Sequence, residues 1–247
     1  KYIHRMKTLF ISDVHISDDY PEIYKQFFDF IKTIDNNINA LYILGDLFEY
    51  WLGDDDPNPI FKKTRNALKD LSNNNVPVFF MHGNRDFLVG DEFAKKSHIK
   101  ILSDPSIIEL YGERILISHG DMYCIDDEEY QSFRKQTRDP QWQKMILGKP
   151  LEYRKNFAKM ARAKSLEHTQ LDNEIIMDVN EDEVKKMLDQ FNLSTIIHGH
   201  THRPFIHNTI SNEVNYRRIV LGDWYEQGSI LEWSESGPKL IKLNRNH

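Results

Sequence analysis

The chain has 247 residues, 40% hydrophobic and 12% aromatic, which fits one large domain or a domain with an insertion. Its single cysteine, Cys124, excludes an internal disulfide and a thiolate zinc cluster and indicates a reducing compartment, which we take to be the cytoplasm. No run approaches the ~18 apolar residues of a membrane span, and the segment before Met6, the expected natural start, lacks the apolar core of a signal peptide.

The first half of the chain alternates short apolar runs with amphipathic segments. Apolar residues recur at helical spacing after Pro21, and a second helix is expected after Pro59. This alternation predicts an α/β layered fold. The predicted strands cover 6–12, 40–44, 77–81 and, as the second of two β runs after a short helix at 92–96, 114–118.

The pattern changes between residues 124 and 178, where Gln, Lys, Arg and Met replace the β-branched runs. We interpret 124–178 as a helical insertion in a core formed by 6–123 and 179–247. A helix at 181–191, a strand at 194–197 and four β segments between 205 and 243 complete that core. The net charge of −6 is unevenly divided, because residues 131–165 carry ten Lys or Arg and two acids, a net charge of +8 against −14 elsewhere.

Side chains that can bind metal follow five of the apolar runs, in the motifs DVH, GDLFEYW, GNRD, SHGD and HGHTH. Any one of them could be a turn residue, a helix cap or a buried histidine, but independent caps have no reason to follow five separate strands. In an α/β sheet the loops at the carboxyl ends of the strands converge on one crevice. The candidate ligands are Asp13, His15, Asp46, Asn84, His119, His200 and His202.

These ligands combine carboxylate, amide and imidazole groups, which suits Mn²⁺, Fe²⁺ or Zn²⁺. Seven are too many for one ion, so we expect two ions bridged by Asp46. Two ions about 3.5–4 Å apart are the arrangement that clamps the attacking and leaving oxygens of an in-line displacement at phosphorus. The nucleophile would be a hydroxide held between the ions.

The five motifs, in this order, resemble the calcineurin-like metallophosphoesterase superfamily. LYILGDLFEYWLGDDDPNP at 41–59, HGNRDFLVG at 82–90, IIMDVN at 175–180 and HGHTHRP at 198–204 are similar to the bacterial UDP-2,3-diacylglucosamine hydrolase family, from Met6 onwards. The resemblance implies a calcineurin-like β-sandwich flanked by helices, with the insertion as a lipid-binding cap. It also implies two Mn²⁺ ions and cleavage of the pyrophosphate of UDP-2,3-diacylglucosamine to UMP and 2,3-diacylglucosamine 1-phosphate, a step of lipid A synthesis.

The resemblance assigns a role to each matching residue. One ion would bind Asp13, His15, Asp46 and His202, and the other Asp46, Asn84, His119 and His200, with Asp46, Asn84, His119 and His200 as the catalytic group. The substrate would contact Asn84, Arg85, Asp127, Ser165, Thr169, Asp172 and His200.

Three of these expectations carry alternatives. Arg85 offers a planar fork for phosphate oxygens but could instead pair with Asp86 or another local acid. Where the family has a lysine late in the insertion, this chain has Asp172, and a small gap could bring Lys164 into that role. We expect His198 to orient a neighbour or a substrate oxygen from outside the ligand shell. A general acid, if one is needed, would be His198 or His200.

The insertion predicts two surfaces. An apolar groove for acyl chains would be lined by Trp142, Met145, Ile146, Phe157 and Met160, although such residues are more often ordinary core. Basic residues would dock a monomer on the anionic cytoplasmic face of the inner membrane, with no role for nucleic acid. They are Arg134, Lys135, Lys144, Lys149, Arg154, Lys155 and Lys159.

Two other functions stay open on the sequence alone. A dimetal phosphodiesterase acting on nucleotides or nucleic acid would use the same ligands, but a nuclease should show a basic path into the catalytic face. A non-catalytic protein-binding scaffold predicts missing ligands, whereas every ligand position is filled.

Overall fold

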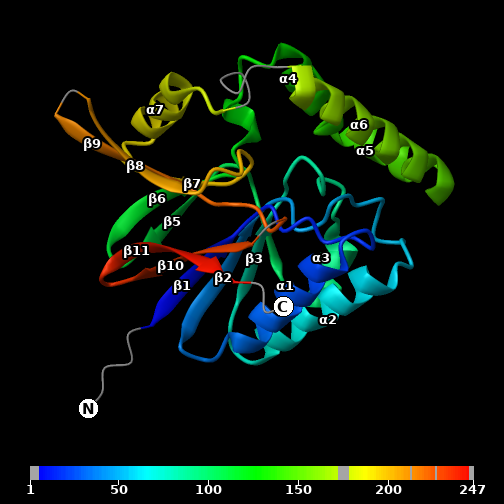
Figure 1. Ribbon diagram of the computed structural model, residues 1–247, viewed down its shortest axis with the longest axis horizontal. Helices are drawn as coiled ribbons and strands as arrows, with labels where there is room; N and C mark the ends of the chain where they lie inside the picture. The colour runs from blue at the N-terminus through cyan, green and yellow to red at the C-terminus, as the bar shows by residue number, and fades with distance from the viewer. Residues whose placement is uncertain (1–5, 172–177, 212, 226, 245–247) are drawn as a thin grey trace.

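The computed structural model describes residues 6–171, 178–211, 213–225 and 227–244, and for 164–171 only the backbone. Two sheets stack face to face (Figure 1). The first has the order β11-β10-β1-β2-β3-β4, in which β1 to β4 are parallel and β10 and β11 are antiparallel additions. Its strands are β1 (Lys7–Ile11), β2 (Ile38–Leu44), β3 (Val78–Met81), β4 (Lys100–Leu102), β10 (Gly228–Ser234) and β11 (Gly237–Leu243).

The second sheet has the order β5-β6-β7-β9-β8, and β6, β7 and β9 are parallel within it. Its strands are β5 (Ser106–Leu110), β6 (Glu113–Ile117), β7 (Thr195–His198), β8 (Phe205–Ser211) and β9 (Val214–Val220). The sequence predicted two β runs between the short helix and His119, but the structure has three strands there. β4 is a separate three-residue strand on the edge of the first sheet, and its shortness hides it in the sequence.

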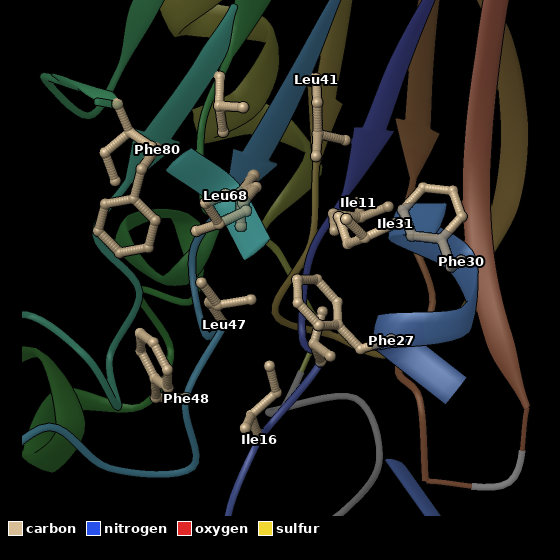
Figure 2. Packing of buried hydrophobic residues seen from close by; sticks show 14 of the residues in the cluster. Ile11, Ile16, Phe27, Phe30, Ile31, Leu41, Leu47, Phe48, Leu68 and Phe80 are labelled. Atoms are coloured by element: carbon tan, nitrogen blue, oxygen red, sulfur yellow. The ribbon is translucent and has the colours of Figure 1, made fainter. Parts of the chain in front are cut away.

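Helices cover both outer faces of the sandwich, as predicted. α1 (Pro21–Thr33), α2 (Pro59–Asn73) and α3 (Asp91–Ser97) pack on the first sheet, and α7 (Glu181–Gln190) packs on the second. Figure 2 shows Ile11, Leu41 and Phe80 of the strands packed against Phe27 of α1 and Leu68 of α2.

Side chains that alternate along the strands form the layer between the two sheets. Leu9 and Ile11 of β1 face the helices, whereas Phe10 packs with Ile117 and Ile197 of the other sheet. Strands buried on both faces explain the nearly continuous apolar runs of the sequence.

The insertion lies beside the sandwich as a group of three helices (Figure 1). They are α4 (Glu128–Thr137), α5 (Pro140–Leu147) and α6 (Leu151–Leu171), preceded by the short 3₁₀ helix η1 (Asp121–Tyr123). Asp127 and Asp139 cap α4 and α5 by accepting backbone N–H groups. Within the described ranges, no helix has both the length and the apolar character needed to span a bilayer.

Candidate metal centre

The structure brings the seven candidate ligands together at one edge of the sandwich. β1, β2 and β3 belong to the first sheet and β6 and β7 to the second, so both sheets deliver side chains to the same crevice. Asp13 and His15 follow β1, Asp46 follows β2, Asn84 follows β3, His119 follows β6, and His200 and His202 follow β7.

Asp13, His15 and His202 form a first cluster. Nε2 of His202 lies 3.3 Å from Oδ1 of Asp13 and 3.3 Å from Nε2 of His15. On the outer side of the two rings, Nδ1 of His15 lies 3.2 Å from a Glu49 oxygen, and Nδ1 of His202 lies 3.4 Å from an Asp223 oxygen. A proton on each Nδ1, facing these carboxylates, would leave the two Nε2 atoms as the ligand atoms that face the centre of the cluster.

Asn84, His119 and His200 form a second cluster. Oδ1 of Asn84 lies 2.9 Å from Nε2 of His119 and 3.0 Å from Nδ1 of His200. Nδ1 of His119 donates to the Leu44 carbonyl at 2.8 Å, so Nε2 is the nitrogen that carries the lone pair when the ring is neutral. In that form the lone pair faces the oxygen of Asn84.

Asp46 lies between the two clusters. Its Oδ2 is 3.7 Å from Nε2 of His119, and one ligand atom from each of Asp13, Asp46 and His119 lies within 4.8 Å of the others. Its Oδ1 accepts the N–H of Arg85 at 2.8 Å, which fixes the orientation of the carboxylate. This position suits a bridging ligand.

The donor atoms fit divalent cations. In each cluster two acceptors face one another at about hydrogen-bond distance, an arrangement that is repulsive unless a proton or a cation lies between them. Oδ1 of the fully buried Asp13 accepts no hydrogen bond within the described part of the chain. A cation in each cluster would satisfy these atoms, and nitrogen and oxygen donors without a thiolate suit Mn²⁺, Fe²⁺ or Zn²⁺.

Protons occupy this region when no cation does. Burial alone would lower the pKa of His119, but Asp46, Asp121 and Asp13 outweigh it and raise the pKa to about 9. Burial and the charge on His119 lower the pKa of His200 to about 3, so that ring is neutral. Metal binding to the second cluster must therefore displace the proton of His119.

Most of the ligands lie on left-handed turns. Non-glycine residues in this conformation cost about 1 kcal/mol or more each and are concentrated at functional sites. Five of the seven ligands have φ between 53° and 68°: Asp13, His15, Asp46, His200 and His202.

Two glycines make room for the carboxylates. A Cβ atom at Gly83 would collide with Oδ1 of Asp46, and one at Gly199 would collide with Oδ2 of Asp13. The glycines of the GNRD and HGHTH motifs are therefore required by close approach of the backbone to a ligand.

Comparison with known proteins identifies the family. Residues 6–204 match the calcineurin-like phosphoesterase family. The UDP-2,3-diacylglucosamine hydrolase of Stenotrophomonas maltophilia (strain K279a) is 47% identical, over 97% of this chain and 100% of that protein. The chain belongs to the calcineurin-like phosphoesterase family. The resemblance predicted from the motifs is confirmed.

A second relative and one solved structure complete the comparison. The UDP-2,3-diacylglucosamine hydrolase of Xanthomonas oryzae pv. oryzae (strain PXO99A) is also 47% identical, over 95% of this chain and 98% of that protein. A structure of an archaeal phosphodiesterase aligns over 96% of this chain and 100% of its own, with 14% identity and a TM-score of 0.49.

Asp86 organises the turns of this phosphoesterase rather than pairing with Arg85. Its carboxylate accepts the N–H groups of Gly83 and Leu47, both at 2.8 Å, and more distant ones from Asp46 and Phe48. Burial and the Asp46 carboxylate raise the pKa of Asp86 to about 7, and the N–H groups act against that rise by stabilising the anion. The guanidinium of Arg85 is therefore not needed to neutralise its neighbour.

Acids that were not among the predicted site residues support the clusters. Glu49 and Asp223 orient the two histidines of the first cluster. Asp121 accepts the hydroxyl of Tyr130 at 2.6 Å and Nε of Arg134 at 2.9 Å, which fixes α4 beside the loop of His119. Both Glu49, in LFEYW, and Asp223, in LGDWY, are acids within an apolar and aromatic run, and that pattern is the signal that could have revealed them.

His198 packs behind the centre. It has no exposed surface, its Nδ1 lies 2.9 Å from the Gly199 carbonyl, and its ring leaves no room for a side chain at Gly120. It therefore supports the loop of His119 and cannot reach a substrate oxygen. Burial lowers its pKa to about 4, so the ring of His198 is neutral.

Some of the insertion residues predicted to contact lipid or membrane are buried, and others are exposed. Arg154 is only 4% exposed, and it pairs with Asp55 and the Leu52 carbonyl. Arg134 pairs with Asp121. The prediction that these two arginines dock a membrane was therefore wrong, because both neutralise acids within the protein. Ile146 is buried, whereas Met145 and Met160 are exposed.

The predicted substrate contacts of the insertion are only partly described. Asp127 uses one oxygen to cap α4, accepting the N–H of Tyr130 at 2.8 Å. Lys164, Ser165 and Thr169 lie on α6 where the structure describes the backbone alone, and Asp172 lies outside the described residues.

Proposed function

We propose that this phosphoesterase hydrolyses the pyrophosphate of UDP-2,3-diacylglucosamine to UMP and 2,3-diacylglucosamine 1-phosphate, a step of lipid A synthesis. Relatives named UDP-2,3-diacylglucosamine hydrolase are 47% identical to this chain over almost their entire length. The observation that carries the proposal is the pair of clusters, in which nitrogen and oxygen atoms that can bind a cation lie about 3 Å apart on either side of Asp46.

The proposed cofactors are two Mn²⁺ ions. Asp13, His15, Asp46 and His202 would bind one ion, and Asp46, Asn84, His119 and His200 the other. When bound, two divalent cations activate water for attack on phosphorus and neutralise the charge that develops on the phosphate oxygens.

Arg85 would bind the phosphate. Its N–H is bonded to Asp46, and its carbonyl accepts the N–H of Trp51 at 3.2 Å, so the backbone beside Asn84 is fixed from both sides. A half-buried guanidinium at this position can donate in parallel to two phosphate oxygens.

The insertion would bind the acyl chains. Trp142 packs against Phe157 of α6 and Phe87 of the core, with ring centroids 5.4 and 6.1 Å away. Phe87 follows Arg85 by two residues, so this aromatic group begins beside the proposed phosphate site and continues into the insertion. A lipid bound at the ions would extend along it.

The outer surface of the insertion supports docking on an anionic membrane. Exposed lysines lie among exposed apolar side chains such as Met145, Tyr153 and Met160. Each basic residue near an anionic leaflet contributes about 1 kcal/mol. We propose a monomer on the cytoplasmic face of the inner membrane, held by Lys135, Lys144, Lys149, Lys155 and Lys159.

Release of UMP tests the function. The purified chain should produce UMP from UDP-2,3-diacylglucosamine, lose that activity to a chelator and recover it with Mn²⁺. Equal efficiency on water-soluble UDP-sugars would contradict the lipid substrate. Strong, salt-dependent binding of DNA would instead favour a nucleic-acid phosphodiesterase.

A further inference from the structure

Glu49 is a buried carboxylate in contact with a candidate ligand and with the insertion. It is 2% exposed. One oxygen lies 3.2 Å from Nδ1 of His15 and accepts the hydroxyl of Tyr225 at 2.7 Å. The other oxygen lies 3.1 Å from Nε of Arg162, which belongs to α6. Both oxygens are therefore engaged, and one of them faces the outer nitrogen of His15.

The ring of His15 is fixed from two directions. Tyr225 stacks on it, with centroids 5.0 Å apart and planes 15° from parallel, while its hydroxyl donates to Glu49. A carboxylate on Nδ1 turns the Nε2 lone pair toward the metal position and increases the basicity of the ring. The geometry of the first cluster thus depends on Glu49 remaining in place.

Glu49 in turn depends on Arg162. A carboxylate buried to this degree is costly unless a cation or several donors compensate it. Within the described residues, Arg162 is the cation in direct contact with it besides the imidazole of His15, while Arg85 acts on it from farther away. Arg162 also lies 3.7 Å from Asp19. Without this arginine, Glu49 would turn toward solvent, and His15 would lose the carboxylate beside its Nδ1.

Arg154 provides a matched comparison on the same helix. It lies about two turns before Arg162 and also joins α6 to the core, through Asp55 and the Leu52 carbonyl. Neither partner is a candidate ligand. Both arginines therefore connect the insertion to the core. Of the two, only Arg162 does so through a residue that contacts the first cluster, Glu49.

We propose that Glu49 is a positioning residue for the divalent cation of the first cluster, and that Arg162 makes this cation site depend on the docking of α6 against the core. The inference rests on the proposed two-metal function. Because linkage is reciprocal, a cation in the first cluster should also stabilise the docked insertion.

Equilibrium dialysis of the full-length protein against Mn²⁺, followed by metal analysis, tests the proposal. Wild type should bind two ions. Glu49→Gln should weaken one of them about 10–100-fold, the usual effect of losing a carboxylate behind a histidine ligand, and leave the other unchanged. In a His200→Ala background, which damages the second cluster, Glu49→Gln should weaken the remaining ion.

The arginines separate positioning from general packing. Arg162→Gln should weaken the same ion about tenfold, and Arg154→Gln should leave both affinities unchanged. Hydrogen exchange in α6 should slow on addition of Mn²⁺ in wild type and in Arg154→Gln, but not in Arg162→Gln.

Other results of these measurements would contradict the proposal. Wild-type affinities in Glu49→Gln, or loss of both ions together with the near-ultraviolet circular dichroism of the folded protein, would overturn the role of Glu49. Equal effects of the two arginine substitutions, or tighter binding in Arg162→Gln, would overturn the link to the insertion. A wild-type protein that binds no Mn²⁺ would refute the proposed function itself.

Discussion

The two clusters of the metal centre are supported by different chemistry. In the first, carboxylates of Glu49 and Asp223 face the outer nitrogens of His15 and His202. In the second, the outer nitrogen of His119 faces a backbone carbonyl, and Asn84 is neutral. A carboxylate makes an imidazole a more basic ligand than a carbonyl does. We therefore expect the first cluster to hold its cation more tightly and the second to exchange it more readily.

Removing the carboxylate of Asp46, which both clusters share, should abolish the difference in cation affinity between them, because both clusters are damaged. Asp46→Ala should lose both Mn²⁺ ions and slow hydrolysis about a thousandfold or more, since the ions contribute several kcal/mol to the transition state. Metal analysis and UMP release measure the two losses, and circular dichroism checks the fold. Retained activity would move the site elsewhere.

Removing the side chain proposed to bind the phosphate, Arg85, should leave cation binding to both clusters unchanged. Arg85→Ala should keep both ions and lower kcat about 100-fold, a typical loss for one preorganised donor to a developing charge. Arg85→Lys should recover part of the rate, because it restores the charge without the fork. A changed metal stoichiometry in Arg85→Ala would show that Arg85 acts on the ions instead.

Removing a carboxylate behind His202 should weaken the first cluster alone. Asp223→Asn should lower the affinity of one ion about tenfold, and the two affinities measured by dialysis should become more alike. Asp189→Asn, which alters a surface acid bonded to Tyr216, serves as the control. Loss of the weaker ion in Asp223→Asn would reverse the assignment of the two clusters.

Acidity should weaken cation binding to the second cluster, and also to the first, where Asp13 and Asp223 outweigh burial and raise the pKa of His202. Because the pKa of His119 is raised to about 9 without metal, each pH unit below that value should cost its cation about tenfold in affinity. The raised pKa also stabilises the metal-free protein below about pH 6.5, the unfolded value, and that stability is lost as the pH rises toward 9. Urea unfolding between pH 6 and 10 should show this loss in wild type but not in His119→Asn.

Changing the apolar insertion should leave the clusters as they are and give the smallest effect. Replacing Trp142 and Phe157 by Ala together should raise KM for the acylated substrate about tenfold, because apolar contact with the chains is lost. Hydrolysis of a small phosphodiester serves as the internal control. Equal losses on both substrates would make the two residues part of the core instead.

Much of the fold could be read from the sequence because local pattern sets it. Apolar runs such as 40–44 and 77–81 became β2 and β3, and Pro21 and Pro59 begin the helices that they mark. β4 escaped prediction because three residues carry too little pattern. The side chains at the strand ends were also predictable as neighbours, since parallel strands bring their carboxyl ends to one edge.

The sequence by itself determined which candidate ligands lie together, because each strand delivers its motif to the same crevice. Only the tertiary structure decided what lies behind each ligand. Glu49 meets His15 across 34 positions and Arg162 across more than a hundred, and no local pattern records such a contact. The basic residues of the insertion are a second example of contacts that only the tertiary structure decided. Their charge was visible in the sequence, but only the fold decided that Arg134 pairs with the buried Asp121 and that the buried Arg154 pairs with Asp55 and the Leu52 carbonyl.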